Sequence, residues 1–599
     1  MRLDTNAGSS RVDTDVLIIG GGPVGLTLAN LLGVRGQRAT VLEARPELID
    51  YPRGVGLDDE SIRTLQTAGL WQAVQPYTVP HHVVRFVNGK GQVLATNDPR
   101  TDEFGHPRKH GFIQPLVDAE LAAGLDRFDE TELRFGHTVV GMVEESDRVC
   151  VEVERADGTR TALTASYVVG CEGGRSFTRG WMDVDFVGKS PSTRWLVVDV
   201  ADDPIGTPSV YLGADPRRPY VSIGLPHGIR RWEFMLFDSE ATELVEEPAF
   251  MRRLLAPHVP DPDALSVINK RVFTHHGRIA STFRKGRVMI AGDAAHLMPV
   301  WLGQGWNSGI RDATNLAWKL TAVLTGQAED TLLDSYSEER HQHASDMIEV
   351  NMAAGAIMKC GPVKGRLRDL AAAALNVAPS VKSYFSELRF KPMPRYGRGV
   401  VVDQATLEPG RSSASLRGNR LQPFVDAAGD TSPVGLQFIQ PRVNTVDTTD
   451  VLLDDVLGDW WTLAAWGNNP ARHLGPDELE LVRRFGIRLV SFMPETQRSW
   501  AEREYADSPV PVTVIGDPTG RLKTWFDTRA CGVVVLRPDR FVAAAALAQQ
   551  AGEALRATLA AASYRRDPVR GGVDGVPVPP TVIEPTVVET PVIEEGAPA

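Results

Sequence analysis

Three glycines near the amino terminus have the spacing of a phosphate-binding turn. The segment V-L-I-I-G-G-G-P-V-G places Gly20, Gly22 and Gly25 directly after an apolar run, and Pro23 opens a stretch with helical spacing. The pyrophosphate of a dinucleotide needs a tight turn, a backbone that it can approach closely and a helix N-terminus directed at its charge. The order of strand, glycine turn and helix therefore predicts a dinucleotide site.

An acidic residue supports this prediction. A second apolar run, Ala39 to Leu42, ends at Glu43, where a carboxylate would accept hydrogen bonds from a ribose diol. The alternative is a glycine turn in any doubly wound protein, since the glycine motif alone is weak. The strand, the helix and Glu43 together favour the dinucleotide.

Length and charge restrict the class of protein. The chain has 599 residues, which at roughly 150 residues per domain predicts about two to four domains. It carries 64 basic and 76 acidic residues, a formal net charge of −12, without a Lys/Arg stripe that could follow a phosphate backbone. We therefore expect a multidomain protein that does not bind nucleic acid.

Cysteine content and hydropathy indicate the compartment. Cys150, Cys171, Cys360 and Cys531 are widely spaced and form no C-x-x-C, so neither a disulfide framework nor a metal site is expected. The first residues lack the apolar core of a secretory signal, and no run of about 18 apolar residues occurs. These patterns favour a soluble, cytoplasmic protein that does not enter a membrane.

The order of patterns predicts an α/β fold with a Rossmann-like domain in two pieces, residues 15–190 and 270–395. Short alternating runs between Trp195 and Val272, separated by Pro and Gly turns, predict an inserted antiparallel β-sheet domain over residues 191–269. We expect this insertion to form the wall of a substrate pocket.

The carboxyl-terminal third is predicted to contain one further domain. Residues 396–433 are rich in Pro, Gly, Arg and Ser and are interpreted as a linker. Strand and helix patterns alternate over residues 434–563, which predicts a small α/β domain. Residues 564–599 form an acidic, Pro-rich tail without periodicity, and we expect it to be disordered.

Three signatures, Gly20–Gly25, Glu172–Arg179 and Gly292–Pro299, resemble those of the single-component FAD-dependent aromatic hydroxylases. The segments Ile49–Glu60, Thr101–Arg108, Phe112–Pro115, Arg218–Ser222 and Gly292–Gly309 resemble the members that act on 3-(3-hydroxyphenyl)propionate. The resemblance implies bound FAD, NADH as co-substrate, and transfer of one atom of O2 to the ring carbon ortho to a phenol. The implied substrates are a small phenolic acid, 3-(3-hydroxyphenyl)propionate, and its 3-hydroxycinnamate analogue, in aromatic catabolism.

The resemblance also assigns residues to the cofactor. Asp293 would accept hydrogen bonds from the ribityl hydroxyls, although an acidic residue there could simply cap a helix. Arg53 and Gln114 resemble FAD contacts, and the segment at Glu172 departs from the family pattern by carrying Glu in place of Asp. The residues implied to line the flavin ring are Pro299, Gly303, Gln304, Gly305 and Asn307.

Catalysis requires a group that handles the phenol proton, because a phenol has a pKa of about 10. The resemblance favours Asp58. The competing interpretation is structural, since Asp58, Asp59 and Glu60 stand at the start of a predicted helix, where acidic residues are favourable. His296 is a second candidate base, with bracing of the G-D loop as its alternative role.

A substrate carboxylate calls for a cation, and four arginines of the predicted sheet are candidates: Arg217, Arg218, Arg230 and Arg231. Trp301 could stack on the substrate ring or simply pack in the core. The carboxyl-terminal domain resembles a thioredoxin-like domain without the C-x-x-C, which implies a structural or dimer-forming role. Two alternatives stay open: hydroxylation of another phenolic or polyketide ring, and a flavin-binding protein or oxidase that does not hydroxylate.

Overall fold

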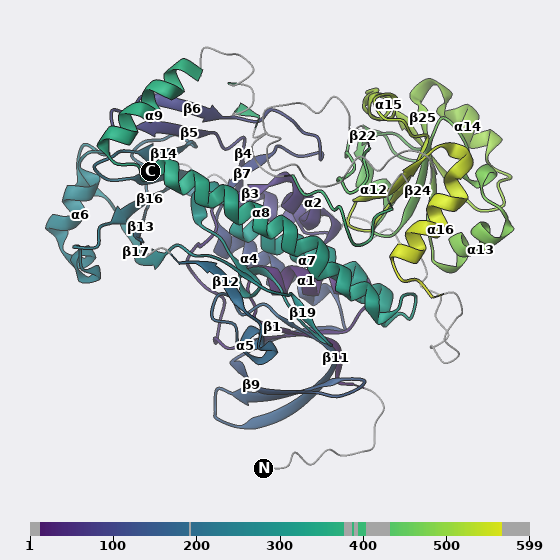
Figure 1. Ribbon diagram of the computed structural model, residues 1–599, viewed down its shortest axis with the longest axis horizontal. Helices are drawn as coiled ribbons and strands as arrows, with labels where there is room; N and C mark the ends of the chain where they lie inside the picture. The colour runs from purple at the N-terminus through teal and green to yellow at the C-terminus, as the bar shows by residue number, and fades with distance from the viewer. Residues whose placement is uncertain are drawn as a thin grey trace, which may run out of the picture.

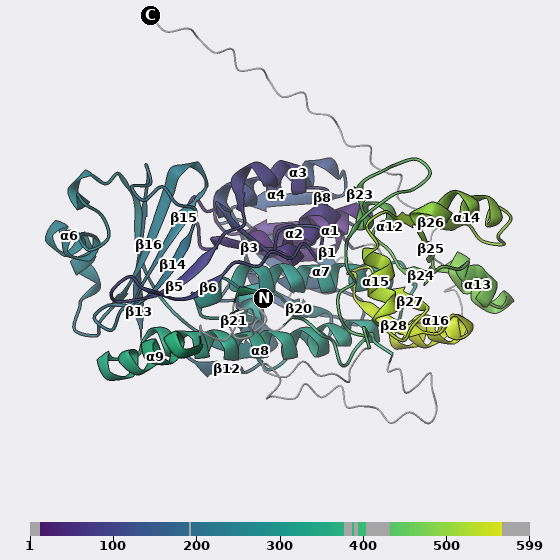
Figure 2. The same ribbon diagram turned by 90° about the horizontal axis from the view of Figure 1, so that it is seen from above.

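The computed structural model describes residues 12–190, 193–375, 393–402 and 432–565, together with positions 382, 386 and 387. Most of the predicted linker and the tail beyond Arg565 lie outside these residues. Seen from above, an antiparallel sheet, a central α/β part and a carboxyl-terminal α/β part follow one another along the long axis (Figure 2). In the described ranges, no helix has the length and apolar character needed to cross a membrane.

The central part is a Rossmann-like sheet with the strand order β19-β20-β11-β1-β2-β8. Strand β1 lies between β11 and β2 and is parallel to both. The bounds are β1 Thr14–Ile19, β2 Ala39–Glu43, β8 Thr131–Phe135, β11 Arg160–Gly170, β19 Arg284–Lys285 and β20 Val288–Ile290.

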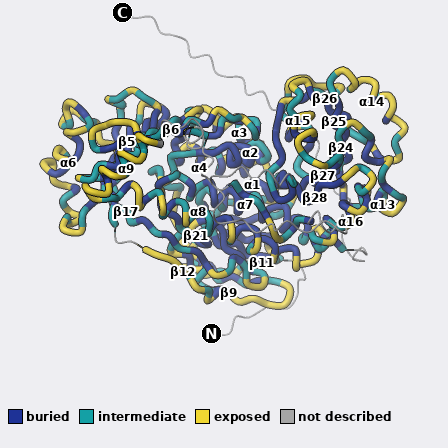
Figure 3. The backbone as a smooth tube through the Cα atoms, turned by 45° about the horizontal axis from the view of Figure 1, so that its top comes forward, coloured by how far each residue is buried: buried dark blue, intermediate teal, exposed yellow. Residues whose placement is uncertain are grey.

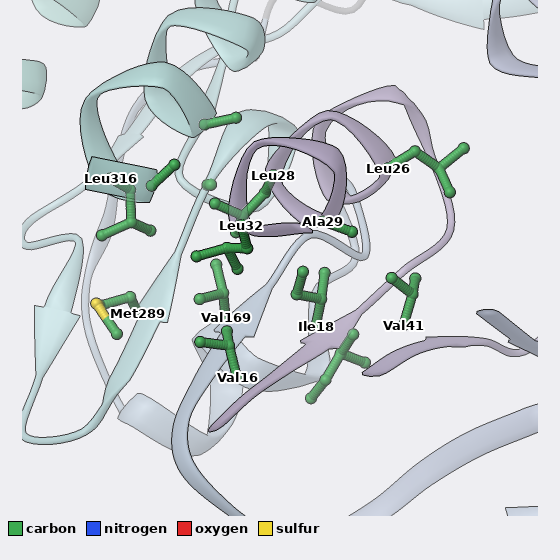
Figure 4. Close-up of a cluster of buried hydrophobic side chains, with 14 of the residues drawn as sticks. Val16, Ile18, Leu26, Leu28, Ala29, Leu32, Val41, Val169, Met289 and Leu316 are labelled. Atoms are coloured by element: carbon green, nitrogen blue, oxygen red, sulfur yellow. The ribbon is translucent and has the colours of Figure 1, made fainter. Parts of the chain in front are cut away.

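Helices α1 (Pro23–Val34) and α7 (Gly305–Leu324) pack on this sheet. Figure 4 shows Val16 and Ile18 of β1 facing Leu28 and Leu32 of α1, with Leu316 of α7 nearby. All five side chains are fully buried, and each contributes about 1.5–3 kcal/mol by leaving water. The continuous apolar run of β1 fits a strand covered on both faces. The tube is largely coloured as buried around α1 and α7 (Figure 3).

A separate, mostly antiparallel sheet has the order β17-β13-β16-β15-β14-β5-β6. Its strands are β5 Val84–Asn88, β6 Val93–Asn97, β13 Arg194–Val200, β14 Val210–Ala214, β15 Tyr220–Leu225, β16 Ile229–Leu236 and β17 Val267–Thr274. One face packs Trp232 and Phe234 against α6 (Pro248–Leu255), and the opposite face lines a cavity. The sheet is wider than residues 191–269, because β5 and β6 come from the first part of the chain.

Two helices connect the central part to this sheet. Helix α8 (Asp334–Met358) crosses the molecule, and α9 (Pro362–Leu375) follows it beside β6 (Figure 1). Their residues Ala354, Met358, Arg368 and Ala371 form one end of the cavity wall.

The carboxyl-terminal part has a mixed sheet of order β26-β25-β24-β27-β28, on the right in Figure 1. Its strands are β24 Thr462–Trp466, β25 Arg488–Pro494, β26 Val512–Asp517, β27 Val533–Leu536 and β28 Val542–Ala546, and its helices include α13 Pro476–Arg484, α14 Arg498–Glu504, α15 Arg521–Asp527 and α16 Ala551–Ala561. The predicted fold class is confirmed: a Rossmann-like domain, a β-sheet domain beside it and a second α/β domain.

A buried ionic cluster attaches this part to the central one. Glu339 of α8 accepts hydrogen bonds from Arg537 (2.7 Å) and from Lys319 of α7 (2.8 Å). Burial raises the pKa of Glu339, but Arg537 and Lys319 outweigh it and hold that pKa at about 2. Removing one partner of such a pair costs about 3–5 kcal/mol, so the two parts are tightly coupled.

Candidate active site

A cavity of about 1400 Å³ lies between the central part and the inner face of the antiparallel sheet. Ordinary ligand pockets enclose about 300–1,000 Å³, so this one has room for a dinucleotide and a small molecule together. Its wall combines the β1–α1 turn, residues 42–58, residues 291–307 and side chains of the sheet. The described residues contain no group of His, Cys, Asp and Glu side chains that could hold a metal ion.

The glycine turn is built as its spacing predicts. Gly20 has φ +111°, and a Cβ on Gly25 would stand 2.2 Å from the carbonyl oxygen of Gly20, so neither position accepts a side chain. A Cβ on Gly22 would meet nothing within 4 Å, because Gly22 faces the cavity at the start of α1. Glu43 Oε2 accepts a hydrogen bond from the Gly21 N–H (2.7 Å). The turn thus presents open space and a helix N-terminus to a phosphate.

Asp293 faces the same cavity. It is reachable from the cavity, and it makes no hydrogen bond or ion pair with any residue that the structure describes. Its side chain is exposed to the cavity, and the loss of water to the surrounding protein raises its pKa, against smaller opposing effects of His296 and Arg53. A carboxylate in such a place requires donors, and the hydroxyls of a ribityl chain would supply them.

The segment after Asp293 forms one wall. Gly303, with φ +64°, Gln304 and Gly305 line the cavity, whereas the neighbouring Pro299 does not. Asn307 also lines it and holds the wall together: its side chain donates to the carbonyls of Gly56 (2.9 Å) and Gly303 (2.8 Å). The amide oxygen of Asn307 accepts a hydrogen bond from the Asp58 N–H (3.1 Å).

Gln114 fixes the opposite wall. Its Oε1 accepts from the backbone N–H groups of Arg53 (2.9 Å) and Gly54 (2.6 Å), and its Nε2 donates to Asp118 (3.0 Å). Burial raises the pKa of Asp118 to about 7. Gln114 therefore positions the loop from which Arg53 reaches the cavity.

The unusual Glu172 folds back on its own loop. Its carboxylate accepts from Ser176 Oγ (2.8 Å) and from the Thr178 N–H (2.9 Å), and it also contacts the cavity. The longer side chain is thus used to brace the glycine turn that follows β11.

The two candidate bases are both held by other groups. Asp58, at the end of β3 (Gly56–Asp58), caps α2 (Asp59–Thr67) by accepting from the Ser61 N–H (3.0 Å), and its second oxygen pairs with Arg311. Asp58 lines the cavity. Its contacts, however, are those of a residue that caps a helix and pairs with an arginine. Arg311 also binds Glu60 (2.8 Å), and these two carboxylates raise its pKa against the opposing effect of burial.

His296 does not line the cavity. Its Nε2 contacts Asp312 Oδ2 at 2.7 Å, and the same carboxylate accepts from the Gly292 N–H (2.9 Å) and from Arg340 (2.7 Å through Oδ1). These contacts fit the alternative role expected for His296, bracing of the loop that carries Asp293.

Of the four predicted substrate arginines, only Arg231 lines the cavity. Arg217, Arg218 and Arg230 lie elsewhere, paired with Asp215, Glu240 and Asp203 respectively. Arg231 is itself held by Asp199 through two hydrogen bonds, 2.7 and 2.9 Å, and donates to the Pro52 carbonyl (2.8 Å). Arg217 and Arg218 lie in the connection between β14 and β15, and alternation along β16 turns Arg230 to the face opposite Arg231.

An aromatic cluster forms the far end of the cavity. Trp301, which lines it, meets Trp195 edge-to-face at 4.9 Å, and His275 stacks on Trp195 at 5.3 Å. Both ring nitrogens of His275 are buried without a hydrogen bond to any described residue, and burial lowers its pKa to about 3. Trp301 thus serves core packing and cavity lining together.

The charged cavity residues that were not predicted include Arg271 of β17 and Glu233 of β16. The Arg271 guanidinium packs on the Tyr51 ring and has no carboxylate partner among the described residues. Alternation groups residues 269, 271 and 273 on one face of β17 and residues 231 and 233 on one face of β16, and the packing of the sheet makes these the inner face.

Comparison with known proteins identifies the family. Residues 13–351 match the family model described as FAD binding domain, and residues 435–561 match the one described as HcaD C-terminal domain. The chain therefore belongs to the family of FAD-dependent monooxygenases that carry this FAD binding domain, which confirms the resemblance seen in its motifs.

Individual relatives extend over nearly the whole chain. A protein of Mycobacterium avium (strain 104) named 3-(3-hydroxy-phenyl)propionate/3-hydroxycinnamic acid hydroxylase is 50% identical over 551 residues, covering 90% of both chains. A protein of the same name from Mycolicibacterium gilvum (strain PYR-GCK) is 48% identical over 571 residues, covering 95% of both. The crystal structure of the flavin-dependent monooxygenase PieE in complex with FAD and substrate has a TM-score of 0.76 at 20% identity, covering 92% of this chain and 100% of that one. At that identity the last comparison concerns the fold alone.

Proposed function

We propose that this enzyme uses NADH and O2 to hydroxylate 3-(3-hydroxyphenyl)propionate, and also 3-hydroxycinnamate, to the 2,3-dihydroxy product. The observation that carries the proposal is one cavity that joins the glycine turn and Asp293 to an apolar chamber against the sheet. The names of relatives about half identical over nine-tenths of the chain support the substrate.

The residues present fit FAD. Gly22 leaves open space at a helix N-terminus for a pyrophosphate, Glu43 stands at the end of β2 for a ribose, and the unpartnered Asp293 would accept from ribityl hydroxyls. We propose that Arg53, Gly303, Gln304 and Gly305 complete the contacts. When bound, FAD supplies the transfer of reducing equivalents from NADH to O2 and the delivery of one oxygen atom to the ring. No second glycine fingerprint occurs in the sequence, so NADH is proposed to bind only transiently.

The sheet side of the cavity binds the ring and excludes water. Val210, Leu212, Val221 and Ile223 present apolar side chains to it, and Trp301 closes the chamber. A chamber without water would limit side reactions with solvent while FAD is bound.

We further propose that Arg271 receives the propionate carboxylate. It is the cavity arginine of this sheet whose charge is not already balanced by a carboxylate, whereas Arg231 is held by Asp199. Arginine binds carboxylates through paired, charge-assisted hydrogen bonds.

Product analysis tests the proposal. Purified enzyme loaded with FAD is mixed with NADH and 3-(3-hydroxyphenyl)propionate, and products are separated by liquid chromatography with mass detection. We expect the 2,3-dihydroxy acid in near-equal amount to the NADH consumed. 3-Phenylpropionate, which lacks the hydroxyl, is the matched control and should give no catechol. NADH oxidation that yields hydrogen peroxide without the dihydroxy acid would overturn the proposed function.

A further inference from the structure

Glu233 is a buried carboxylate that faces the cavity from the middle of the antiparallel sheet. On the inner face, its neighbours across the strands are Val197 of β13 and Val221 of β15, both apolar. Glu233 is 6% exposed, and its carboxylate makes no hydrogen bond with any residue that the structure describes. A buried carboxylate without donors is costly, so this position indicates a partner that arrives with the substrate.

The surrounding charges leave Glu233 able to exchange a proton. Its nearest cation is Arg231, 3.9 Å away, and Arg231 is already held by two hydrogen bonds to Asp199. Burial raises the pKa of Glu233 to about 6, Arg231 acts in the opposite direction, and Asp199 adds to the rise. Glu233 is therefore ionised at neutral pH while remaining more basic than an ordinary carboxylate, as a general base requires.

Strand register places Glu233 at a useful distance from Arg271. Val197 is the register partner of Glu233 on one side and of Arg271 on the other. Neighbouring strands lie about 4.8 Å apart, so the two backbones are separated by about 10 Å. A molecule with a phenol at one end and a carboxylate at the other can span such a pair. Asp58, in contrast, already uses both carboxylate oxygens.

We propose that Glu233 is the catalytic base that takes the proton of the substrate's phenol hydroxyl; this rests on the proposed function. The phenol O–H bond breaks, the proton moves to a Glu233 carboxylate oxygen, and the electron pair stays on the phenol oxygen. The ring is thereby made electron-rich at the ortho carbon that receives oxygen. Rearomatisation releases the ring hydrogen as a proton, the phenol oxygen recovers its proton from Glu233, and the carboxylate is ionised again.

Replacement of Glu233 tests this role. Glu233→Gln keeps the shape of the side chain but cannot accept the proton. We expect the hydroxylation rate at pH 7.5 to fall about 100-fold, in the range of general-base contributions, with unchanged FAD content. The acid limb of the wild-type kcat profile, expected near the pKa of Glu233, should disappear in Glu233→Gln and persist in Glu233→Asp at an intermediate rate.

Glu240→Gln is the matched control, because Glu240 also pairs with an arginine of this sheet region, Arg218, but does not line the cavity. It should retain the wild-type rate and pH profile. If Glu233→Gln keeps the wild-type hydroxylation rate or the wild-type acid limb, the proposal is refuted. If Glu233→Gln does not fold, Glu233→Asp decides: loss of the acid limb in that variant also refutes it. Wild-type enzyme that makes no dihydroxy acid would instead refute the proposed function.

Discussion

The two halves of the cavity are built in different ways. On the nucleotide half, the wall is backbone from short segments, the glycine turn after β1 and residues 53–58, held in place by Glu43, Gln114 and Asn307. On the sheet half, the wall consists of side chains contributed by strands that are far apart in the sequence.

The halves also differ in how their polar groups are satisfied. Glu43, Gln114 and Asn307 hydrogen-bond to the protein and so shape the surface, whereas the Asp293 carboxylate has no hydrogen bond to a described residue. On the sheet half, Glu233 and His275 face the cavity without a hydrogen bond to a described residue. Ligand binding thus depends mainly on backbone conformation in the nucleotide half and mainly on side-chain charge and hydrogen bonding in the sheet half.

The largest effect should come from the backbone of the nucleotide half. Gly25→Ala forces a methyl group to within 2.2 Å of the Gly20 carbonyl oxygen, and overpacking of this kind costs about 3 kcal/mol. We expect a lower melting temperature without added FAD and no bound FAD after purification. Thermal unfolding and the flavin absorbance of the purified protein measure the two effects.

Gly22→Ala is the matched control. Its methyl group would meet no atom within 4 Å, so the fold should be as stable as the wild type without FAD. The same methyl occupies the space left for the pyrophosphate, and FAD content should still fall. Equal losses of stability in the two variants would contradict the view that the fold requires a glycine at position 25 but not at position 22.

An intermediate effect should come from a charge on the sheet half. Arg271→Met removes the cation proposed for the substrate carboxylate, and hydrogen bonds to charged groups contribute about 1.5–3 kcal/mol. We expect KM for 3-(3-hydroxyphenyl)propionate to rise about 10- to 100-fold, while KM for 3-ethylphenol, which lacks the carboxylate, changes little. Steady-state kinetics with both compounds measure the difference.

Arg217→Met controls for the loss of an arginine from the same sheet region, since Arg217 is exposed and paired with Asp215. It should leave both KM values unchanged. A rise in KM for both compounds in Arg271→Met would show that Arg271 shapes the chamber and does not bind the carboxylate.

The smallest effect concerns pH and His275. Its pKa is about 3 in the folded protein and about 6.5 when unfolded, so the unfolded chain binds the proton first as pH falls. The contribution of His275 to stability is complete above pH 6.5 and decreases towards pH 3. The wild type should lose unfolding free energy when the pH is lowered from 7 to 5.5. His275→Phe keeps the stacking on Trp195, and its loss over the same pH interval should be smaller by about 1 kcal/mol. Urea unfolding at both pH values tests this, and an unchanged difference would refute it.

Features encoded in neighbouring residues could be predicted from the sequence. Gly20, Gly22 and Gly25, the strand before them and the helix after them form one local unit, because each constraint acts within a few residues. The helix-capping alternative for Asp58 was recognisable for the same reason, since an N-cap bonds to a residue three positions on. Which face of a strand meets the cavity was not predictable, because the packing of the sheet decides it: Arg230 and Arg231 are adjacent in β16, yet of these two only Arg231 lines the cavity.

The residue patterns therefore determined a dinucleotide-binding α/β protein, because its phosphate turn and its alternating strands are properties of short segments, and the family resemblance of its motifs added the flavin. Only the tertiary structure decided which side chains face the substrate. Glu233 and Arg271 are 38 positions apart in the sequence, yet both adjoin Val197, because pairing between β16, β13 and β17 fixes their register. Strand pairing over long distances sets that register, and no local pattern in the chain records it.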